Sequence, residues 1–375
     1  LIDGFQLNIE QWVMSDTLFE VLLIIGFCAV LWNRRPGWVA CVIAGLALSL
    51  AVWVRFAGIF MIAPAVLLLL MVMPTWKLRL QRAVAICVVF AIPIAAYGMW
   101  YKAVNGEFKV SSSSGPLLYA RAASFVDCGS IDLPDYEKPL CPNVPVKDRL
   151  PTNCYAWCGD LSPAGNKYTP PPGMDKNQVL NDFAKRVFKA QPLRYLKVVT
   201  GDFLHGFEWG RSNRREDIAA DYWGFTKEYP KFVGAGVPQQ VVARFGGPAP
   251  IAHPALTKPL AKYQDIFYTN GPFLALGLVL GLIAAAGIGR ARRSGLQAAA
   301  LFWPLGGLVV TVIAYATSEF TWRYQMPLVI FYPVAGAVGL FALLGGTRRG
   351  GEAEPAHAQD SPEPQSAIDA PSTAG

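Results

Sequence analysis

WVACVIAGLALSLAVWVRFAGIFMIAPAVLLLLMVM, residues 38–73, contains a single charged side chain, Arg55, in an otherwise uncharged and mostly apolar stretch. A bilayer core requires about 20 apolar residues per helix, so this stretch is long enough for two membrane spans that turn round at Arg55. We therefore predict helices at 38–54 and 56–73. A soluble globular chain would not need so apolar a hairpin, and the stretch indicates an integral membrane protein.

Further apolar runs of similar length lie on both sides of a long, more polar segment. Together they predict an all-α, polytopic membrane protein with about seven transmembrane helices, the remaining spans being 17–33, 83–101, 271–289, 296–316 and 324–345. The predicted organisation is four transmembrane helices in residues 1–101, an external loop domain in 102–269, three transmembrane helices in 270–346 and a tail in 347–375.

Basic residues indicate the orientation, because Lys and Arg in short loops stay on the cytoplasmic side. The short turns after alternate predicted spans contain basic residues and no acid: Arg34 and Arg35; Lys77, Arg79 and Arg82; Arg290, Arg292 and Arg293; Arg348 and Arg349. These turns are predicted to be cytoplasmic, so the turn at Arg55, the segment 102–269 and the turn 317–323 face outward. The net charge of +7 then reflects topology, and the dispersed basic residues, without a stacking motif, argue against nucleic-acid binding.

The two ends of the chain also carry predictions. The chain begins LIDGFQLNIEQW, with neither an initiator Met nor a targeting segment, although the predicted topology places this start outside. We interpret the sequence as the C-terminal portion of a longer protein. The tail 347–375 is rich in Ala, Pro and Ser and is predicted to be disordered and cytoplasmic.

Four cysteines lie close together in the predicted external segment, among Pro and Asp residues: Cys128, Cys141, Cys154 and Cys158. Their number and placement suit two disulfides in an oxidising compartment. Four cysteines allow three connectivities, and we expect pairing between sequence neighbours. A zinc site is the alternative, although no His lies nearby.

Two amphipathic stretches follow the cysteines, one at 179–189 and one in LRYLKVVTGDFLHGF (193–207), separated by Pro192. Apolar residues recur in them at helical spacing, opposite Asp, Lys and Arg. Such helices either pack on the core of the external domain or rest on the membrane surface with basic side chains toward lipid phosphates. Both interpretations remain open.

Charged residues at the ends of spans are the candidate functional residues, because charge in or near hydrocarbon is costly. Asp16, in QWVMSDTLFEVLL (11–23), lies at the outer edge of the first predicted span, with Glu20 one helical turn further in. Asp16 could be a helix N-cap together with Ser15, or a functional carboxylate. Arg55 could extend to the interface, or hold a phosphate through two hydrogen bonds at headgroup level.

Two further outward stretches contain candidates. In TSEFTWRYQMP (317–327), Glu319 and Arg323 are four residues apart, a spacing that allows them to neutralise one another on a helix, and Trp322 and Tyr324 could be interface anchors. The other stretch is LLYARAASFVDCG (117–129), with Tyr119 and Arg121. The sequence contains no glycine-rich phosphate loop, no His-based metal pair and no nucleophile elbow.

The order of these features resembles the bacterial lipid-carrier-dependent glycosyltransferases of the GT-C fold, which are related to protein O-mannosyltransferases and aminoarabinose transferases. Three stretches carry the resemblance: SDTLFEVLLIIGFCAVLWNRR (15–35), GLALSLAVWVRFAGIFMIAP (45–64) and RYQMPLVIFYPVAGAVGL (323–340). LLYARAASFVDC (117–128) and QPLRYLKVVTGDFLHGF (191–207) also look like a subset of such proteins. The resemblance covers most of 1–345, and the order of the motifs is a stronger signal than any one of them.

The resemblance implies transfer of a hexosyl or pentosyl group from a polyprenyl-phosphate-linked donor to an acceptor at the outer face of a bacterial cytoplasmic membrane, in building the cell envelope. Arg55 would hold the carrier phosphate, and Arg323, Tyr324, Glu319, Tyr119 and Arg121 are candidates for lining the substrate cavity. The family's usual catalytic base lies in an external loop that this chain does not contain, so Asp16 matches a secondary acid. The fragment alone would then be incomplete as an enzyme.

The mechanism implied is inverting: a carboxylate deprotonates the acceptor hydroxyl while arginine stabilises the departing phosphate. It requires no cofactor, and a divalent cation is compatible with it. Two other classes of function remain open. One is a transporter or flippase of lipid-linked substrates, and the other is a non-enzymatic membrane binding or scaffold protein.

Overall fold

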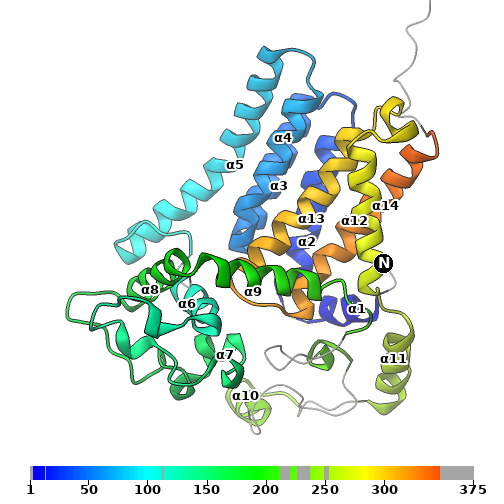
Figure 1. Ribbon diagram of the computed structural model, residues 1–375. Helices are drawn as coiled ribbons and strands as arrows, with labels where there is room; N and C mark the ends of the chain where they lie inside the picture. Colours follow the sequence, from blue (N-terminus) through cyan, green and yellow to red (C-terminus); the bar gives the residue numbers. More distant parts are fainter. Residues whose placement is uncertain are drawn as a thin grey trace, which may run out of the picture.

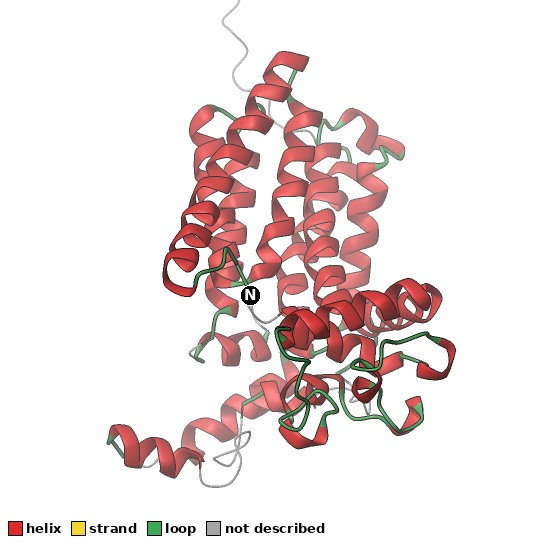
Figure 2. Ribbon diagram, turned by 90° about the vertical axis from the view of Figure 1, so that its left-hand side faces the viewer, coloured by secondary structure: helices red, strands yellow, loops and turns green. Residues whose placement is uncertain are grey.

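The computed structural model describes residues 3–12, 14–111, 114–211, 220–225, 237–248 and 253–346, and every structural statement below concerns these residues. In this part of the chain all regular structure is helical: fourteen α-helices, several short 3-10 segments and no strand (Figure 2). The predicted tail 347–375 lies outside the described residues, as do Arg348 and Arg349.

The longest helices lie side by side in a bundle, through which the chain passes alternately in opposite directions (Figure 1). Their apolar sequences favour helices because a helix satisfies its backbone hydrogen bonds without water. The bundle consists of α2 (Asp16–Leu31), α3 (Trp38–Val54), the 3-10 segment η1 (Phe56–Met61) with α4 (Ile62–Val72), α5 (Trp76–Asn105), α12 (Gly271–Ala285), α13 (Gln297–Thr317), and the 3-10 segment η8 (Trp322–Gln325) with α14 (Met326–Leu343).

The remaining helices gather at one end of this bundle, which we call the domain-facing end (Figure 1). Asp16, Arg55 and the 318–325 turn lie there. All but the first of these helices belong to the segment 106–270, here called the inserted region. They are α1 (Gly4–Glu10), α6 (Ser114–Phe125), α7 (Thr152–Trp157), α8 (Lys176–Ala190), α9 (Pro192–His205), α10 (Val237–Phe245) and α11 (Pro254–Ile266).

Three helical segments are long and apolar enough to cross a membrane: Trp76–Asn105, Gln297–Thr317 and Trp322–Leu343. A fourth candidate is the pair Ala255–Ile266 and Gly271–Ala285, which is bent by 48°. The predicted spans at 38–54 and 56–73 form shorter apolar helices, Trp38–Val54 and Phe56–Val72, and α2 has 16 residues. The structure thus contains three or four candidate spans of a multi-pass membrane protein.

Glycines bring the bundle helices close together. A Cβ atom added to Gly277 on α12 would lie 2.2 Å from the Tyr332 carbonyl oxygen on α14, and one on Gly336 would lie 2.8 Å from the Gly277 Cα. Close approach at small residues is typical of helix packing in membranes, where no hydrophobic effect drives association. Nearby, the Phe27 ring stacks on Phe302, with ring centres 4.1 Å apart, and joins α2 to α13.

The start of α5 corrects one prediction. Residues 77–82 do not form a turn but lie on the first turns of α5, because Thr75 caps the helix: its Oγ1 accepts a hydrogen bond from the Leu78 amide at 3.4 Å. Arg79 Nε donates to the Met73 carbonyl, and the Arg82 guanidinium lies 3.8 Å from the centre of the Trp38 ring. The start of α5, which contains these basic residues, lies at the end of the bundle opposite the inserted region (Figure 1).

The inserted region has an apolar core of its own. The predicted amphipathic stretch 179–189 lies within α8, which buries Val179, Leu180, Phe183, Ala184 and Val187 against α6. For α8, therefore, the structure favours packing on the core of this region over lying on a membrane. Pro192 begins a separate helix, α9, as predicted.

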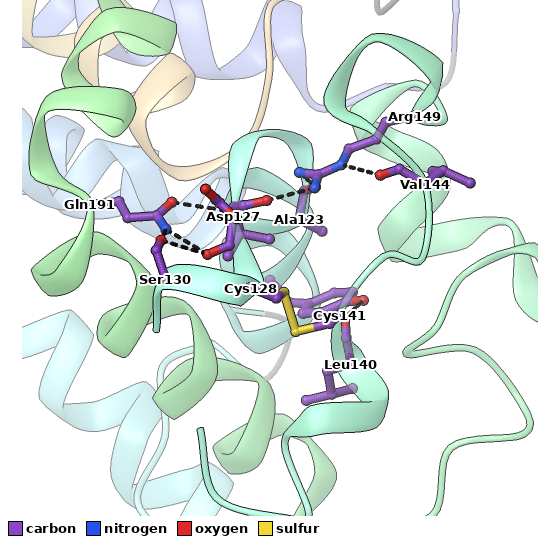
Figure 3. The surroundings of a disulfide bond; sticks show 11 residues. Ala123, Asp127, Cys128, Ser130, Leu140, Cys141, Val144, Arg149 and Gln191 are labelled. Atoms are coloured by element: carbon purple, nitrogen blue, oxygen red, sulfur yellow. Dashed lines mark hydrogen bonds between the residues drawn. A yellow bond between two sulfur atoms is a disulfide. The ribbon is translucent and has the colours of Figure 1, made fainter. Parts of the chain in front are cut away.

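Two disulfides join the four cysteines of the inserted region in the predicted pairing, Cys128 with Cys141 and Cys154 with Cys158. Around the first bridge, Gln191 Nε2 donates hydrogen bonds to the Asp127 carbonyl and to Ser130 Oγ, and so ties the start of α9 to the segment after α6 (Figure 3). The zinc alternative is not what the structure shows.

Candidate functional site

One buried carboxylate and two arginines meet at the domain-facing end of the bundle. Asp16 Oδ1 accepts hydrogen bonds from Arg55 Nη1 and from Arg323 Nε, the latter at 3.1 Å. These three residues lie far apart in the sequence, on α2, after α3 and on η8. The structure thus brings together the acid and the two arginines that the sequence proposed separately.

Local backbone geometry presents each of the three side chains. Asp16 is the first residue of α2, and Ser15 holds the N-cap position before it without making a side-chain capping hydrogen bond. Arg55 ends α3 with an extended backbone (φ −147°, ψ 125°), which turns the chain before η1. Arg323 lies on the short 3-10 segment between α13 and α14.

Pairing of Glu319 with Arg323 is not what the structure contains. The idea required both residues on one helical face, but α13 ends at Thr317 and η8 begins at Trp322, with Thr321 extended (φ −150°, ψ 145°). The Glu319 Oε2 atom instead accepts the Asn153 amide at 2.8 Å, from the first turn of α7. Arg323 is therefore directed at Asp16.

Aromatic rings line the two guanidinium groups. The Tyr324 ring approaches both of them, with its centre 5.1 Å from Arg55 Cζ and 5.6 Å from Arg323 Cζ. Trp223 of the inserted region lies 5.2 Å from Arg323 Cζ. Trp322, in contrast, is only 1 % exposed, so it is a core residue rather than the interface anchor that the sequence suggested.

Exposure separates the acid from the arginines. The side chain of Asp16 is 5 % exposed, while those of Arg55 and Arg323 are 20 % and 21 % exposed. Two guanidinium groups thus share one carboxylate and still reach the surface. Each guanidinium has five N–H donors in a planar fork that matches a phosphate or carboxylate, so the cluster can bind an anion without giving up its contact with Asp16.

A second buried carboxylate lies one helical turn along α2. Glu20 is 3 % exposed, and its Oε2 atom accepts a hydrogen bond from Gln6 Nε2 at 2.8 Å. The same amide lies 3.2 Å from Glu10 Oε1. Sequence reasoning identified Glu20 but missed Gln6, although Asp3, which caps α1 through the amides of Phe5 and Gln6, is a recognisable helix-start signal.

Tyr119 and Arg121 do not join this cluster. Tyr119 lies in the core of the inserted region, where its hydroxyl donates to the Leu140 carbonyl at 2.7 Å and burial raises its pKa. Arg121 Nη2 lies 2.6 Å from Asp202 Oδ2. Arg121 lines a cavity of about 480 Å³ between α6, α9 and residues 146–152, which Glu319 also borders. The candidate residues therefore lie at two separate places, the Asp16 cluster and the inserted region with its cavity.

Metal binding has no support from side-chain clustering, since the described residues contain no group of three or more His, Cys, Asp or Glu placed to hold an ion. What the cluster at Asp16 provides is a pair of oriented, partly exposed cations. Comparisons with models of protein families, with curated proteins and with solved structures found no match to this chain.

Proposed function

We propose that this chain belongs to a GT-C-like membrane glycosyltransferase that moves a sugar from a polyprenyl-phosphate-linked donor to an acceptor at the outer face of a bacterial cytoplasmic membrane. The observation that carries the proposal is the convergence of Arg55 and Arg323 on Asp16. Two accessible cations at the end of an apolar bundle suit a ligand with a phosphate headgroup and a hydrocarbon tail.

The proposed orientation follows from the positions of the charges. The basic residues at the end of the bundle opposite the inserted region would face the cytoplasm: Arg34, Arg35, Lys77, Arg79, Arg82, Arg290, Arg292 and Arg293. The inserted region and the Asp16 cluster then lie outside, at headgroup level. In this arrangement α2, α3 and η1 with α4 also cross the membrane, which gives about seven spans.

The cluster would act on the leaving group. The acceptor oxygen forms a bond to the anomeric carbon while the bond from that carbon to the phosphate oxygen breaks, and the carrier phosphate leaves with the electron pair. Arg55 and Arg323 stabilise the negative charge that develops on it. A carboxylate takes the proton of the acceptor hydroxyl. Asp16 positions both guanidinium groups.

The test is sugar transfer by the full-length protein in membrane vesicles supplied with polyprenyl-phosphate-linked hexose and pentose donors. We expect Arg55→Ala and Arg323→Ala each to lower transfer by about 10²- to 10³-fold, the usual effect of removing one charge-stabilising donor. Arg292→Ala, at the opposite end of the bundle, is the matched control and should retain activity.

Two outcomes would overturn the proposal. One is unchanged transfer in both cluster variants. The other is movement of the intact donor across the membrane without release of the carrier phosphate, which would indicate a flippase. Binding of geranylgeranyl phosphate and SDS-induced unfolding, measured in parallel, separate loss of phosphate contact from loss of folding.

A further inference from the structure

Helix α9 crosses the domain-facing end of the bundle instead of running along it (Figure 1). The Tyr195 hydroxyl donates to the Ala316 carbonyl at 2.9 Å, and so fixes α9 beside the end of α13. Val199 is buried on the same side. Since α13 is long and apolar enough to cross a membrane, α9 lies where such a span would leave the bilayer.

A second face of α9, next to the one that packs on α13, is apolar and open. Leu193, Leu196 and Leu204 are 80 %, 60 % and 59 % exposed, and with Thr200 they follow the helical repeat along one face. A cluster of exposed leucines on a helix that otherwise packs against protein is unusual for a surface in water. The C-terminal part of α5 also exposes large apolar side chains, which include Met99, Trp100 and Val104.

Basic residues follow the edge of this apolar face. Arg194 and Lys197 lie next to the leucines on the helical repeat, and both line the cavity of about 480 Å³ between α9 and α6. The cavity wall contains four basic side chains against two acidic ones: Arg121, Arg149, Arg194 and Lys197 against Asp202 and Glu319. Arg194 Nη2 also lies 3.1 Å from Asp127 Oδ2, and with Asp127 counted the basic side chains still outnumber the acidic ones. An excess of positive charge beside an apolar face complements a lipid with an anionic headgroup.

The back wall of the cavity is a buried arginine. Arg121 is 1 % exposed, and although its Nη2 is paired with Asp202, its buried Nε has no hydrogen-bond partner among the described residues. Arg149, 8 % exposed, donates to the carbonyls of Ala123 and Val126 near the end of α6. The cavity therefore combines two buried arginines with the basic side chains at its surface.

We propose that α9 lies in the headgroup layer of the membrane, with its leucines among the acyl chains, and that the basic cavity beside it binds the phosphate of an anionic phospholipid. This site is separate from the Asp16 cluster and does not depend on the glycosyltransferase proposal. It requires only that the bundle resides in a bilayer.

The test is native mass spectrometry of the detergent-solubilised protein titrated with phosphatidylglycerol or with phosphatidylcholine. We expect tighter binding of phosphatidylglycerol. Arg194→Ala with Lys197→Ala should weaken it by about 25-fold, since each basic residue near a membrane surface contributes about a fivefold effect. Both side chains are exposed at the surface, so the double variant should fold. Lys138→Ala with Lys167→Ala removes the same charge elsewhere in the inserted region and should leave binding unchanged.

A second arm identifies the source of the phosphate. The triple variant Leu193→Gln, Leu196→Gln and Leu204→Gln should bind phosphatidylglycerol more weakly but keep an unchanged affinity for soluble glycerol phosphate. Equal affinity for the two phospholipids would overturn the proposal, as would unchanged lipid binding in the Arg194 and Lys197 variant. So would glycerol phosphate that binds as tightly as the lipid, because the cavity would then be a site for a soluble anion.

Discussion

Two aspartate–arginine clusters lie at the domain-facing end of the molecule, and they differ in the number of arginines per carboxylate and in how exposed those arginines are. Arg211 faces one carboxylate, with Nη2 3.1 Å from Asp3 Oδ2, and the two side chains are only 5 % and 0 % exposed. Asp16 instead serves two arginines, Arg55 and Arg323, each about a fifth exposed. The first cluster pairs one arginine with one carboxylate, and both are buried, so we call it the closed pair. The second has two arginines for one carboxylate, and a ligand can reach the surplus cation, so we call it the open cluster.

The surroundings of Arg211 explain why it has a structural role. Its guanidinium lies 3.9 Å from the centre of the Phe5 ring and also approaches Tyr268 and Trp322. Burial lowers its pKa, an effect that Asp3 opposes. Asp3 in turn accepts the Thr269 amide at 2.7 Å and caps α1, so this pair ties α1 to the segment that leads into α12.

The largest change in the free energy of unfolding should come from removing the carboxylate of the closed pair. Asp3→Ala leaves Arg211 buried without a counter-charge and removes the cap of α1, so we expect the free energy of unfolding to fall by about 3–5 kcal/mol. The measurement is SDS-induced unfolding of the purified protein in mixed micelles. Asp182→Ala, which breaks an exposed pair with Lys185, should cost less than about 1 kcal/mol. Equal costs for the two variants would remove the distinction between the clusters.

A smaller effect on stability is expected at the open cluster, together with a change in binding. Asp16→Ala should destabilise the protein by only about 1–2 kcal/mol, because both guanidinium groups are exposed enough to turn toward water or lipid phosphate. Removing the carboxylate also increases the surplus positive charge. Affinity for geranylgeranyl phosphate should therefore rise about fivefold, as expected for one unit of charge near a membrane surface.

Arg323→Ala is the matched comparison for that binding measurement and should weaken binding instead. If Asp16→Ala also weakens binding, Asp16 is needed to hold the arginines in a binding geometry, and the surplus of charge is not what determines affinity. Sugar transfer should fall in both variants, because a correctly positioned guanidinium pair is required for leaving-group stabilisation.

Much of the helical framework could be predicted from the sequence, because long apolar runs allow few alternatives. The bounds of α3 agree with the prediction at both ends, and α13 agrees within one residue. The helix at 83–101 was predicted too short, since α5 begins at Trp76. Hydropathy locates the apolar part of a helix, whereas a cap such as Thr75 starts it earlier, within polar sequence.

The sequence indicated which residues form the candidate site but not which of them contact one another. Charged residues next to apolar runs are visible in a sequence, so Asp16, Arg55 and Arg323 were identified. Their contacts depend on how three helix ends meet, which spacing along the chain does not specify. The proposed Glu319–Arg323 pair failed because a helical spacing rule was applied where the chain is not helical. Trp223 was missed because its role depends on contacts between distant segments.

The smallest expected effect concerns the aromatic ring that contacts both guanidinium groups of the open cluster. Tyr324→Ala removes two cation–π contacts and should lower the free energy of unfolding by about 1 kcal/mol, while Tyr324→Phe keeps the ring and should cost almost nothing. SDS-induced unfolding measures both variants, and a double-mutant cycle with Arg323→Ala isolates the contact with that residue. A cost for Tyr324→Phe equal to that for Tyr324→Ala would show that the hydroxyl, and not the ring, supports the cluster. The aromatic surroundings would then no longer be a feature shared with Arg211, and only the ratio of cations to carboxylates would distinguish the two clusters.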